Sequence, residues 1–201
     1  MAGLVSRMSM DEFIRRKDWG ALAPLAPPDA PTMTPELGRE LVQIMVSDIK
    51  KRFSTGTAPD GTRWKPLKFA RPRGGNRPLL DTGRLRSSIV GRFDMNGVTV
   101  GTAHPGAALQ NFGGTVRPVK GKFLAIPLTK EAQRNGTPRQ MTGTDVMPLF
   151  ARMIGGRMIG HFMLLKKVTI PARPFIGLSA EGEAALAEAI LEAAAEQWEG
   201  K

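Results

Sequence analysis

The chain has 201 residues, a net charge of +11 and a hydrophobic fraction of 41%, which fits one domain with extensions, or two very small ones, around a buried core. It has no cysteine, and this excludes disulfide frameworks, thiolate zinc sites and cysteine nucleophiles. Its apolar stretches are too short or too charged for a membrane span or a signal peptide, so we expect a soluble protein made inside a cell and used or assembled there.

The N-terminal region is predicted to hold a short helix followed by an extended arm. Ser9 and Glu12 have the spacing of a capping box, which predicts a helix over about 9–22. Five prolines then fall between positions 24 and 35. Each proline fixes φ and removes a backbone donor, so this stretch should be an arm and neither a helix nor a central strand.

Two longer helices are predicted from capping signals and apolar spacing. Thr34 is a suitable N-cap for the first, over 35–53, and the basic residues at 50–52 suit the negative end of its dipole. Ser179 is a suitable N-cap for the second, over 180–198. Apolar side chains occupy one face of this last helix and glutamates the others, and its alanine-rich composition favours a helix.

The region between these helices is predicted to contain loops and short strands. Asn96-Gly97 is a strong hairpin signal, because both flanks alternate polar and apolar residues. The expected elements, in chain order, are a mobile loop over 68–78, a helical turn over 84–87, hairpin strands over 88–94 and 98–102, a helical turn closed by two glycines within 104–115, a strand over 122–127, an excursion with little pattern over 128–160, and a strand over 162–170.

These elements predict an α+β fold, in which the two long helices pack against one mainly antiparallel sheet. The sheet is expected to combine the hairpin with the strands at 122–127 and 162–170. Residues 1–34 are assigned to the N-terminal helix and proline-rich arm, and 35–201 to the α+β domain, with long loops and a flexible excursion near 128–160.

Catalytic and cofactor motifs are absent from the sequence. His104 and His161 are far apart and outside any zinc-binding spacing, and Ser87 and Ser88 lie in neither a GxSxG elbow nor an SxxK motif. The three Gly-Gly pairs belong to no phosphate-binding loop. We therefore expect no catalytic, cofactor-binding or metal-binding residues, and a protein that is not an enzyme.

Charge is distributed unevenly along the chain. Residues 50–94 carry twelve basic and three acidic side chains, and residues 95–178 carry eleven basic and two acidic ones. Residues 179–201 reverse this, with one basic and six acidic side chains. A basic body could neutralise nucleic-acid phosphates, or it could meet acidic surfaces of other subunits. Because no nucleic-acid-binding motif is present, the second interpretation is favoured.

Five segments, in order, resemble the virion morphogenesis or tail completion family of Mu-like tailed bacteriophages. They are "FSTGTAPDGTRWKPL" at 53–67, "RPLLDTGRLRSSI" at 77–89, "GVTVGTAHPGAALQNFGGT" at 97–115, "KFLAIPLT" at 122–129 and "VTIPARPFIGLS" at 168–179. The resemblance covers about 35–198. One departure is local: family members often show a tyrosine near the proline of the third segment, and this chain has no tyrosine.

The resemblance implies a structural virion protein of the tail or neck, assembled in the cytoplasm of the bacterial host. Such proteins are similar to small α+β proteins that form a homo-oligomeric ring, here expected to be hexameric, at the head-proximal end of the tail. As a tail completion, terminator or neck protein, it would contact the tail tube and the head–tail connector and enable head–tail joining. The alternative is a basic nucleic-acid-binding protein that uses region 50–92. We expect at most non-specific DNA contact, and no membrane contact.

Nine residues are candidates for the interfaces of such an assembly. Trp64 lies between a turn and a proline, and Arg173 and Phe175 link the last strand to the last helix, where they could anchor interface loops. For Trp64 and Phe175, a simple core role is an equally open alternative. The full set is Trp64, Arg84, Arg86, Phe112, Arg173, Phe175, Glu188, Glu192 and Glu196.

Overall fold

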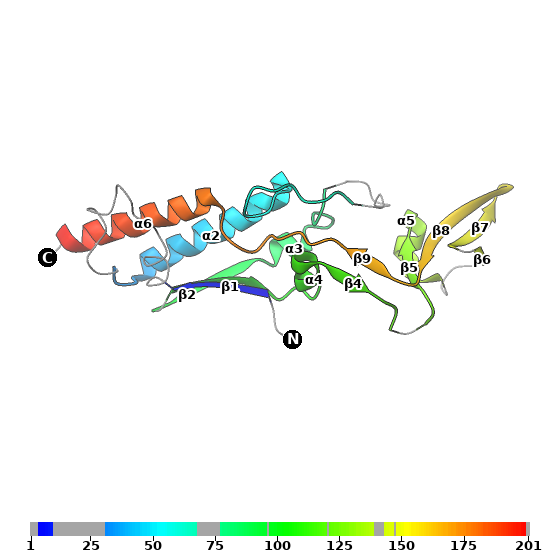
Figure 1. Cartoon of the computed structure of the whole chain (residues 1–201), viewed down its shortest axis with the longest axis horizontal. Helices are drawn as coiled ribbons and strands as arrows, with labels where there is room; N and C mark the ends of the chain where they lie inside the picture. Colours follow the sequence, from blue (N-terminus) through cyan, green and yellow to red (C-terminus); the bar gives the residue numbers. More distant parts are fainter. Residues whose placement is uncertain are drawn as a thin grey trace. The chain divides into compact units, whose positions relative to one another are not determined.

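The fold is α+β, as predicted, with helices and antiparallel sheets (Figure 1). The computed structural model describes residues 4–9, 31–67, 77–95, 97–119, 121–138, 143–146 and 148–199. The chain forms two compact units. Unit 1 is built from described residues within Met1–Trp64, Leu79–Asn111 and Arg173–Lys201, and unit 2 from those within Lys65–Pro78 and Phe112–Ala172.

Unit 1 contains two long helices and a three-stranded antiparallel sheet. The helices are α2 (Pro35–Thr55) and α6 (Ala180–Glu199). The sheet has the order β1-β3-β2, with bounds Leu4–Ser9, Gly97–Thr102 and Val90–Asp94. Helix α2 packs on β2 and β3, and α6 packs along α2 (Figure 1). The larger hydrophobic core lies between these layers.

Helix α2 forms where its capping and apolar signals predict it. The Thr34 hydroxyl accepts a hydrogen bond from the backbone N–H of Leu37 at 3.2 Å, and Pro35 begins the helix. Its buried apolar side chains recur every four residues and face the core: Leu37, Leu41, Met45, Ile49 and Phe53. Helix α6 also begins where predicted, because the Ser179 hydroxyl accepts from the N–H of Gly182 at 3.1 Å.

The predicted hairpin is confirmed and a further strand is added to it. Strands β2 and β3 pair antiparallel, with Asp94 opposite Gly97, and Val98 and Val100 are buried. On its other edge β3 pairs with β1, a strand that the sequence analysis did not predict. Ser9 ends this strand, and the rest of the helix predicted over 9–22 lies outside the described residues. The same holds for most of the loop expected at 68–78.

Two short helices flank the hairpin. Helix α3 (Arg84–Ser87) precedes β2, and α4 (Ala107–Phe112) follows β3. Both were expected as helical turns, and both are confirmed. Each makes backbone hydrogen bonds of helical spacing, such as that from the N–H of Ser87 to the carbonyl of Gly83 at 2.8 Å.

Unit 2 contains a four-stranded sheet, a two-stranded sheet and one short helix. The four-stranded sheet has the order β5-β8-β7-β6, with bounds Leu124–Pro127, Arg157–Leu165, Leu149–Ile154 and Thr144–Val146. The pair of strands is β4 (Gly114–Val116) and β9 (Val168–Ile170). Helix α5 (Lys130–Asn135) contacts β5 and β8, and Ala132, Phe150, Phe162 and Leu164 form a small core.

The prediction of one sheet was wrong, because the strands at 122–127 and 162–170 do not join the hairpin. The stretch 162–170 is itself divided: its first part ends β8 and its last three residues form β9 in another sheet. Lys166 and Lys167, between these strands, are both exposed. The excursion expected over 128–160 holds α5, β6, β7 and the start of β8. Its flexibility and the boundary after residue 34 stay predictions.

Candidate functional site

Three aromatic side chains from distant parts of the sequence meet in the core of unit 1. The ring centroid of Phe53, at the end of α2, lies 5.9 Å from that of Trp64 and 5.4 Å from that of Phe175. The indole N–H of Trp64 donates a hydrogen bond to the carbonyl of Pro174 at 2.9 Å. This cluster therefore fixes the segment 173–179, called the anchored segment below, against α2 and the loop that carries Trp64.

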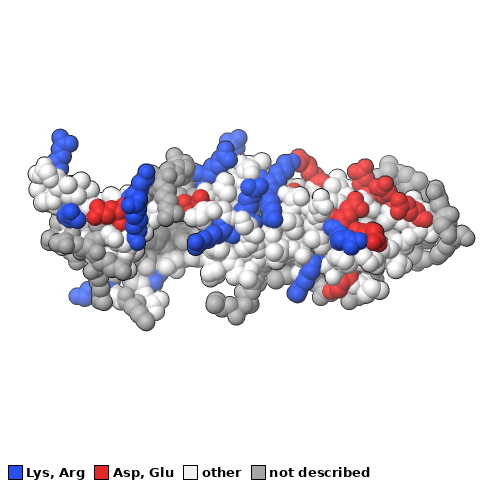
Figure 2. Space-filling model, turned by 180° about the vertical axis from the view of Figure 1, so that it is seen from behind, with Lys and Arg blue, Asp and Glu red and all other residues white. Residues whose placement is uncertain are grey.

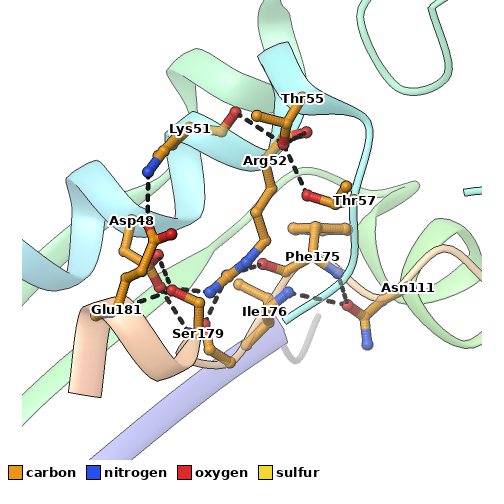
Figure 3. Close-up of polar contacts among 12 residues, drawn as sticks. Asp48, Lys51, Arg52, Thr55, Thr57, Asn111, Phe175, Ile176, Ser179 and Glu181 are labelled. Atoms are coloured by element: carbon orange, nitrogen blue, oxygen red, sulfur yellow. Dashed lines mark hydrogen bonds and ion pairs between the residues drawn. The ribbon is translucent and has the colours of Figure 1, made fainter. Parts of the chain in front are cut away.

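A buried ion pair holds the same segment from its other side (Figure 3). The Arg52 guanidinium pairs with Asp48 one turn earlier on α2, and the two side chains are only 4% and 9% exposed. Nη1 of Arg52 also donates to the carbonyl of Phe175 at 3.0 Å and to that of Gly177 at 2.6 Å. These contacts give the buried charge several hydrogen-bonding partners, as such a charge requires.

Asp48 connects this ion pair to the start of α6. Its carboxylate accepts from the backbone N–H of Ser179 at 3.0 Å and from the Ser179 hydroxyl at 2.6 Å. Glycine at position 182 lets the two helices approach closely here. A Cβ atom on Gly182 would lie only 2.7 Å from Oδ2 of Asp48. One carboxylate thus links α2 to the N-cap of α6.

The pKa values of the buried Arg52 and the exposed Lys51 are shifted in opposite directions. Burial lowers the pKa of Arg52, while the charge of Asp48 and its hydrogen bond act in the opposite direction. Lys51 instead pairs with Glu181 at 2.6 Å on the surface, and this hydrogen bond raises the pKa of Lys51. The basic residues at 50–52 were interpreted as dipole-compensating cations. For Arg52 that interpretation is incomplete, because its main contacts are the buried ones with Asp48 and with the carbonyls of Phe175 and Gly177.

Helix α4 supplies a third attachment for the anchored segment. The Asn111 side-chain oxygen accepts from the backbone N–H groups of Phe175 at 2.9 Å and Ile176 at 3.2 Å. The N–H of Arg173 donates to the carbonyl of Gln110 at 2.9 Å. The sequence "RPFIGLS" is therefore held by its backbone as well as by its aromatic side chain.

Three of the predicted interface residues lie inside the protein. Trp64 is 7% exposed, Arg173 4% and Phe175 0%. They can position the anchored segment and the Trp64 loop from within, and they are not placed to contact a neighbour directly. The structure brings them together in one region of unit 1. Their part in an interface stays a prediction.

The three predicted glutamates lie on the surface of α6. Glu188, Glu192 and Glu196 are exposed and spaced by four residues, so they share one side of the helix, called the acidic face below. The buried residues Leu186 and Ile190 face the core. Within the described part of the chain, none of the three glutamates has an ion-pair partner. Figure 2 shows several acidic side chains close together on the part of unit 1 that contains the two long helices.

The remaining candidates are also exposed. Arg84 and Arg86 lie on the surface of α3 in unit 1. Phe112 ends α4 with 69% of its side chain exposed, and it belongs to unit 2. An exposed phenylalanine is a candidate contact residue because solvation of its ring is unfavourable.

Sequence reasoning missed Asp48 and Asn111, and it assigned Arg52 a different role. The spacing of Asp48 and Arg52 by four residues was the available signal for an ion pair on one helix. Nothing in the local sequence indicates that the pair is buried. Asn111 lies in a segment interpreted only as a helical turn, and its partners are more than sixty residues away.

Among the described residues, no group of three or more histidine, cysteine, aspartate or glutamate side chains could hold a metal ion. In the same part of the chain, no helix has the length and apolar character needed to cross a membrane.

Comparison with known proteins gives two matches. The model of the phage virion morphogenesis family matches residues 20–194. The chain is also similar to the Mu-like prophage FluMu G protein 2 of Haemophilus influenzae, with 35% identity over 91 residues. That alignment covers 45% of this chain and 59% of the relative, so it spans somewhat more than half of the relative's length. No solved structure matches the chain significantly.

Proposed function

Because the chain belongs to the phage virion morphogenesis family, with a structural role in phage assembly, we propose that it completes the tail at the neck of the virion. In this proposal, copies of the chain form a ring at the head-proximal end of the tail. The ring contacts the tail tube on one side and the head–tail connector on the other, and it allows the tail to join a filled head. The protein acts by binding, without catalysis.

The separation of charge in this chain is the observation that carries the ring proposal. A closed ring needs two different surfaces on each subunit that meet head to tail. The acidic face of α6 is one such surface, and the basic residues that dominate 50–178 supply the other. Opposite charges across an interface fix register and speed encounter.

The packing of α6 supports its use as an interface element. Leu186 and Ile190 hold it on α2, and the Asp48 network fixes its first turn. At its other end, the side chain of Gln197 exchanges hydrogen bonds with the backbone of Thr32, at 2.9 and 3.0 Å. The acidic face therefore lies on a helix that is held at both ends, so binding to this face costs little conformational entropy.

Charge reversal on the acidic face is expected to weaken the ring without unfolding the chain. We expect Glu188→Lys, Glu192→Lys and Glu196→Lys, combined, to abolish rings in electron micrographs and to lower the sedimentation coefficient, while circular dichroism stays unchanged. Lysines near the C-terminal end of a helix suit its dipole, so α6 should remain folded. The matched control replaces the same three residues with glutamine, which removes the attraction but adds no repulsion. Unchanged rings in the lysine variant would exclude this surface as the contact.

Micrographs of phage test the place of the protein in assembly. A phage that lacks this protein should accumulate free tails beside filled heads, and complementation with the wild-type chain should restore virions. Normal virions without the protein would overturn the proposed function.

The alternative function, nucleic-acid binding, has some support from the exposed basic side chains of Arg63, Arg84, Arg86 and Arg92 in unit 1. No recognisable reading module accompanies them, and few aromatic residues are interleaved. We expect only weak, sequence-independent DNA binding that largely disappears near physiological salt, because such binding depends on counterion release. A salt titration of DNA binding measures this. Tight binding that discriminates between sequences at that salt would favour the alternative.

A further inference from the structure

The hairpin of β7 and β8 extends beyond the strands that flank it. Strand β6 pairs with β7 only as far as Ala151, and β5 pairs with β8 only from Phe162 onward. Residues 152–159, called the hairpin tip below, therefore pair only with each other among the described strands. Figure 1 shows the two strands of this hairpin reaching past β5 and β6.

The hairpin tip has a defined conformation. Gly155 and Gly156 form a two-residue turn with φ values of 56° and 76°, which suits the twist of the flanking strands. The strands are in register up to this turn, with Ile154 opposite Arg157 and Met153 opposite Met158. The tip is thus a regular two-stranded ribbon presented from the sheet of unit 2.

The side chains of the hairpin tip combine apolar surface with positive charge. Met153 is 61% exposed and its cross-strand partner Met158 is 60% exposed, while Ile154 is 39% exposed. Arg157 is exposed at the end of the ribbon, and Arg152 is partly exposed, 3.5 Å from Glu131. Cross-strand partners share one face of a ribbon, so the two methionines lie on one face, and Arg157 lies on the other face with its partner Ile154 and with Arg152. An exposed isoleucine with cations beside it is typical of a binding surface.

We propose that the hairpin tip binds the acidic face of α6 on a neighbouring copy of the chain. This inference rests on the proposed ring and names its contact. One face of the tip offers Arg152 and Arg157 beside Ile154, and the acidic face offers Glu188, Glu192 and Glu196. The occupant is a second copy because the chain itself carries the complementary surface, and because a tip in unit 2 and a helix in unit 1 form the unlike pair of surfaces that a ring needs.

The shape of the acidic face also fits this partner. Ala184 and Ala195 are exposed on α6 among the glutamates, and Leu191 is half-buried. Small side chains leave room for Ile154 to reach the helix surface, while the glutamates can accept hydrogen bonds from the arginines on the same face of the tip. Charge-assisted bonds of this kind would fix the register of the contact.

The absence of cysteine allows a direct test by disulfide trapping. One preparation carries Ile154→Cys, on the same face as Arg157, and a second, differently tagged, carries Glu192→Cys, and the two full-length chains are mixed under mild oxidation. We expect a mixed disulfide between the two tags, and we expect addition of Arg157→Glu to the first chain to reduce its yield at least about tenfold. The matched control moves the first cysteine to Arg117, an exposed residue elsewhere in unit 2.

The outcomes separate this contact from the proposed function. A mixed disulfide for Ile154→Cys, absent for Arg117→Cys, supports the contact. If rings form in micrographs but no mixed disulfide is preferred, the proposed contact is wrong and the proposed ring stands. A specific mixed disulfide in a protein that forms no rings keeps the contact and overturns the ring. Equal yields of mixed disulfide from the tip cysteine and from Arg117→Cys would also overturn the contact. So would a tip cysteine that forms disulfides only with a protein other than this chain.

Discussion

Replacing Phe175 with alanine is expected to lower the free energy of unfolding by about 3–5 kcal/mol. The ring is fully buried, with its centroid 5.4 Å from that of Phe53, so truncation leaves a cavity in the core of unit 1. The surrounding backbone cannot easily collapse into it, because Asn111 and Arg52 hold the residue's N–H and carbonyl. Urea unfolding followed by circular dichroism measures the change.

Phe112→Ala is the matched control for this prediction. It removes the same side chain from a position that is 69% exposed, and we expect the free energy of unfolding to change by less than about 0.5 kcal/mol. Normal unfolding of Phe175→Ala, together with tails that fail to join heads, would favour an interface role over a core role. If that variant unfolds normally and the phage assembles normally, both interpretations of Phe175 are wrong.

Local signals predicted the helices and the hairpin of unit 1 well. Thr34 and Ser179 both cap helices, and the four-residue apolar spacing of α2 corresponds to its buried face. These signals succeed because a cap or a tight turn is decided by residues within a few positions of each other. The Asn96-Gly97 hairpin belongs to the same class.

Strand partners were not predictable in the same way. The stretch 162–170 is a plausible single strand by composition, yet its two ends pair with strands in different sheets. Pairing depends on which distant segments meet, and this information is absent from a short window. The break falls at two consecutive lysines, Lys166 and Lys167, which are both exposed. For β1, the capping box of Ser9 and Glu12 predicted a helix starting at the residue where the strand ends.

The sequence predicted where the candidate site lies along the chain better than it predicted what the residues of the site do. The segment "RPFIGLS" was identified as important, and the structure places it at the meeting point of α2, α4 and α6. Its key residues are buried, whereas the predicted glutamates are exposed. The difference arises because the Arg52 guanidinium could interact either with the C-terminal end of its own helix or with backbone carbonyls more than a hundred residues away. Only the fold decides between them.

Replacing Arg52 with methionine is expected to cost about 3–5 kcal/mol of folding free energy, because it leaves the buried Asp48 carboxylate without its counter-ion. The carbonyls of Phe175 and Gly177 lose their donor in the same step. Methionine preserves most of the apolar volume of the side chain, so the loss reports on charge and hydrogen bonding. Urea unfolding measures it.

Lys51→Met is the matched control, since Lys51 is adjacent in sequence and also pairs with a carboxylate, but on the surface. Its pairing with Glu181 is screened by water, and we expect little change in stability. Asp48→Asn combined with Arg52→Met completes a double-mutant cycle. If the buried ion pair is the source of the loss, the double variant should be clearly more stable than the sum of the single effects implies. Additive effects would instead show that Asp48 stabilises the fold mainly through its hydrogen bonds to Ser179, independently of Arg52.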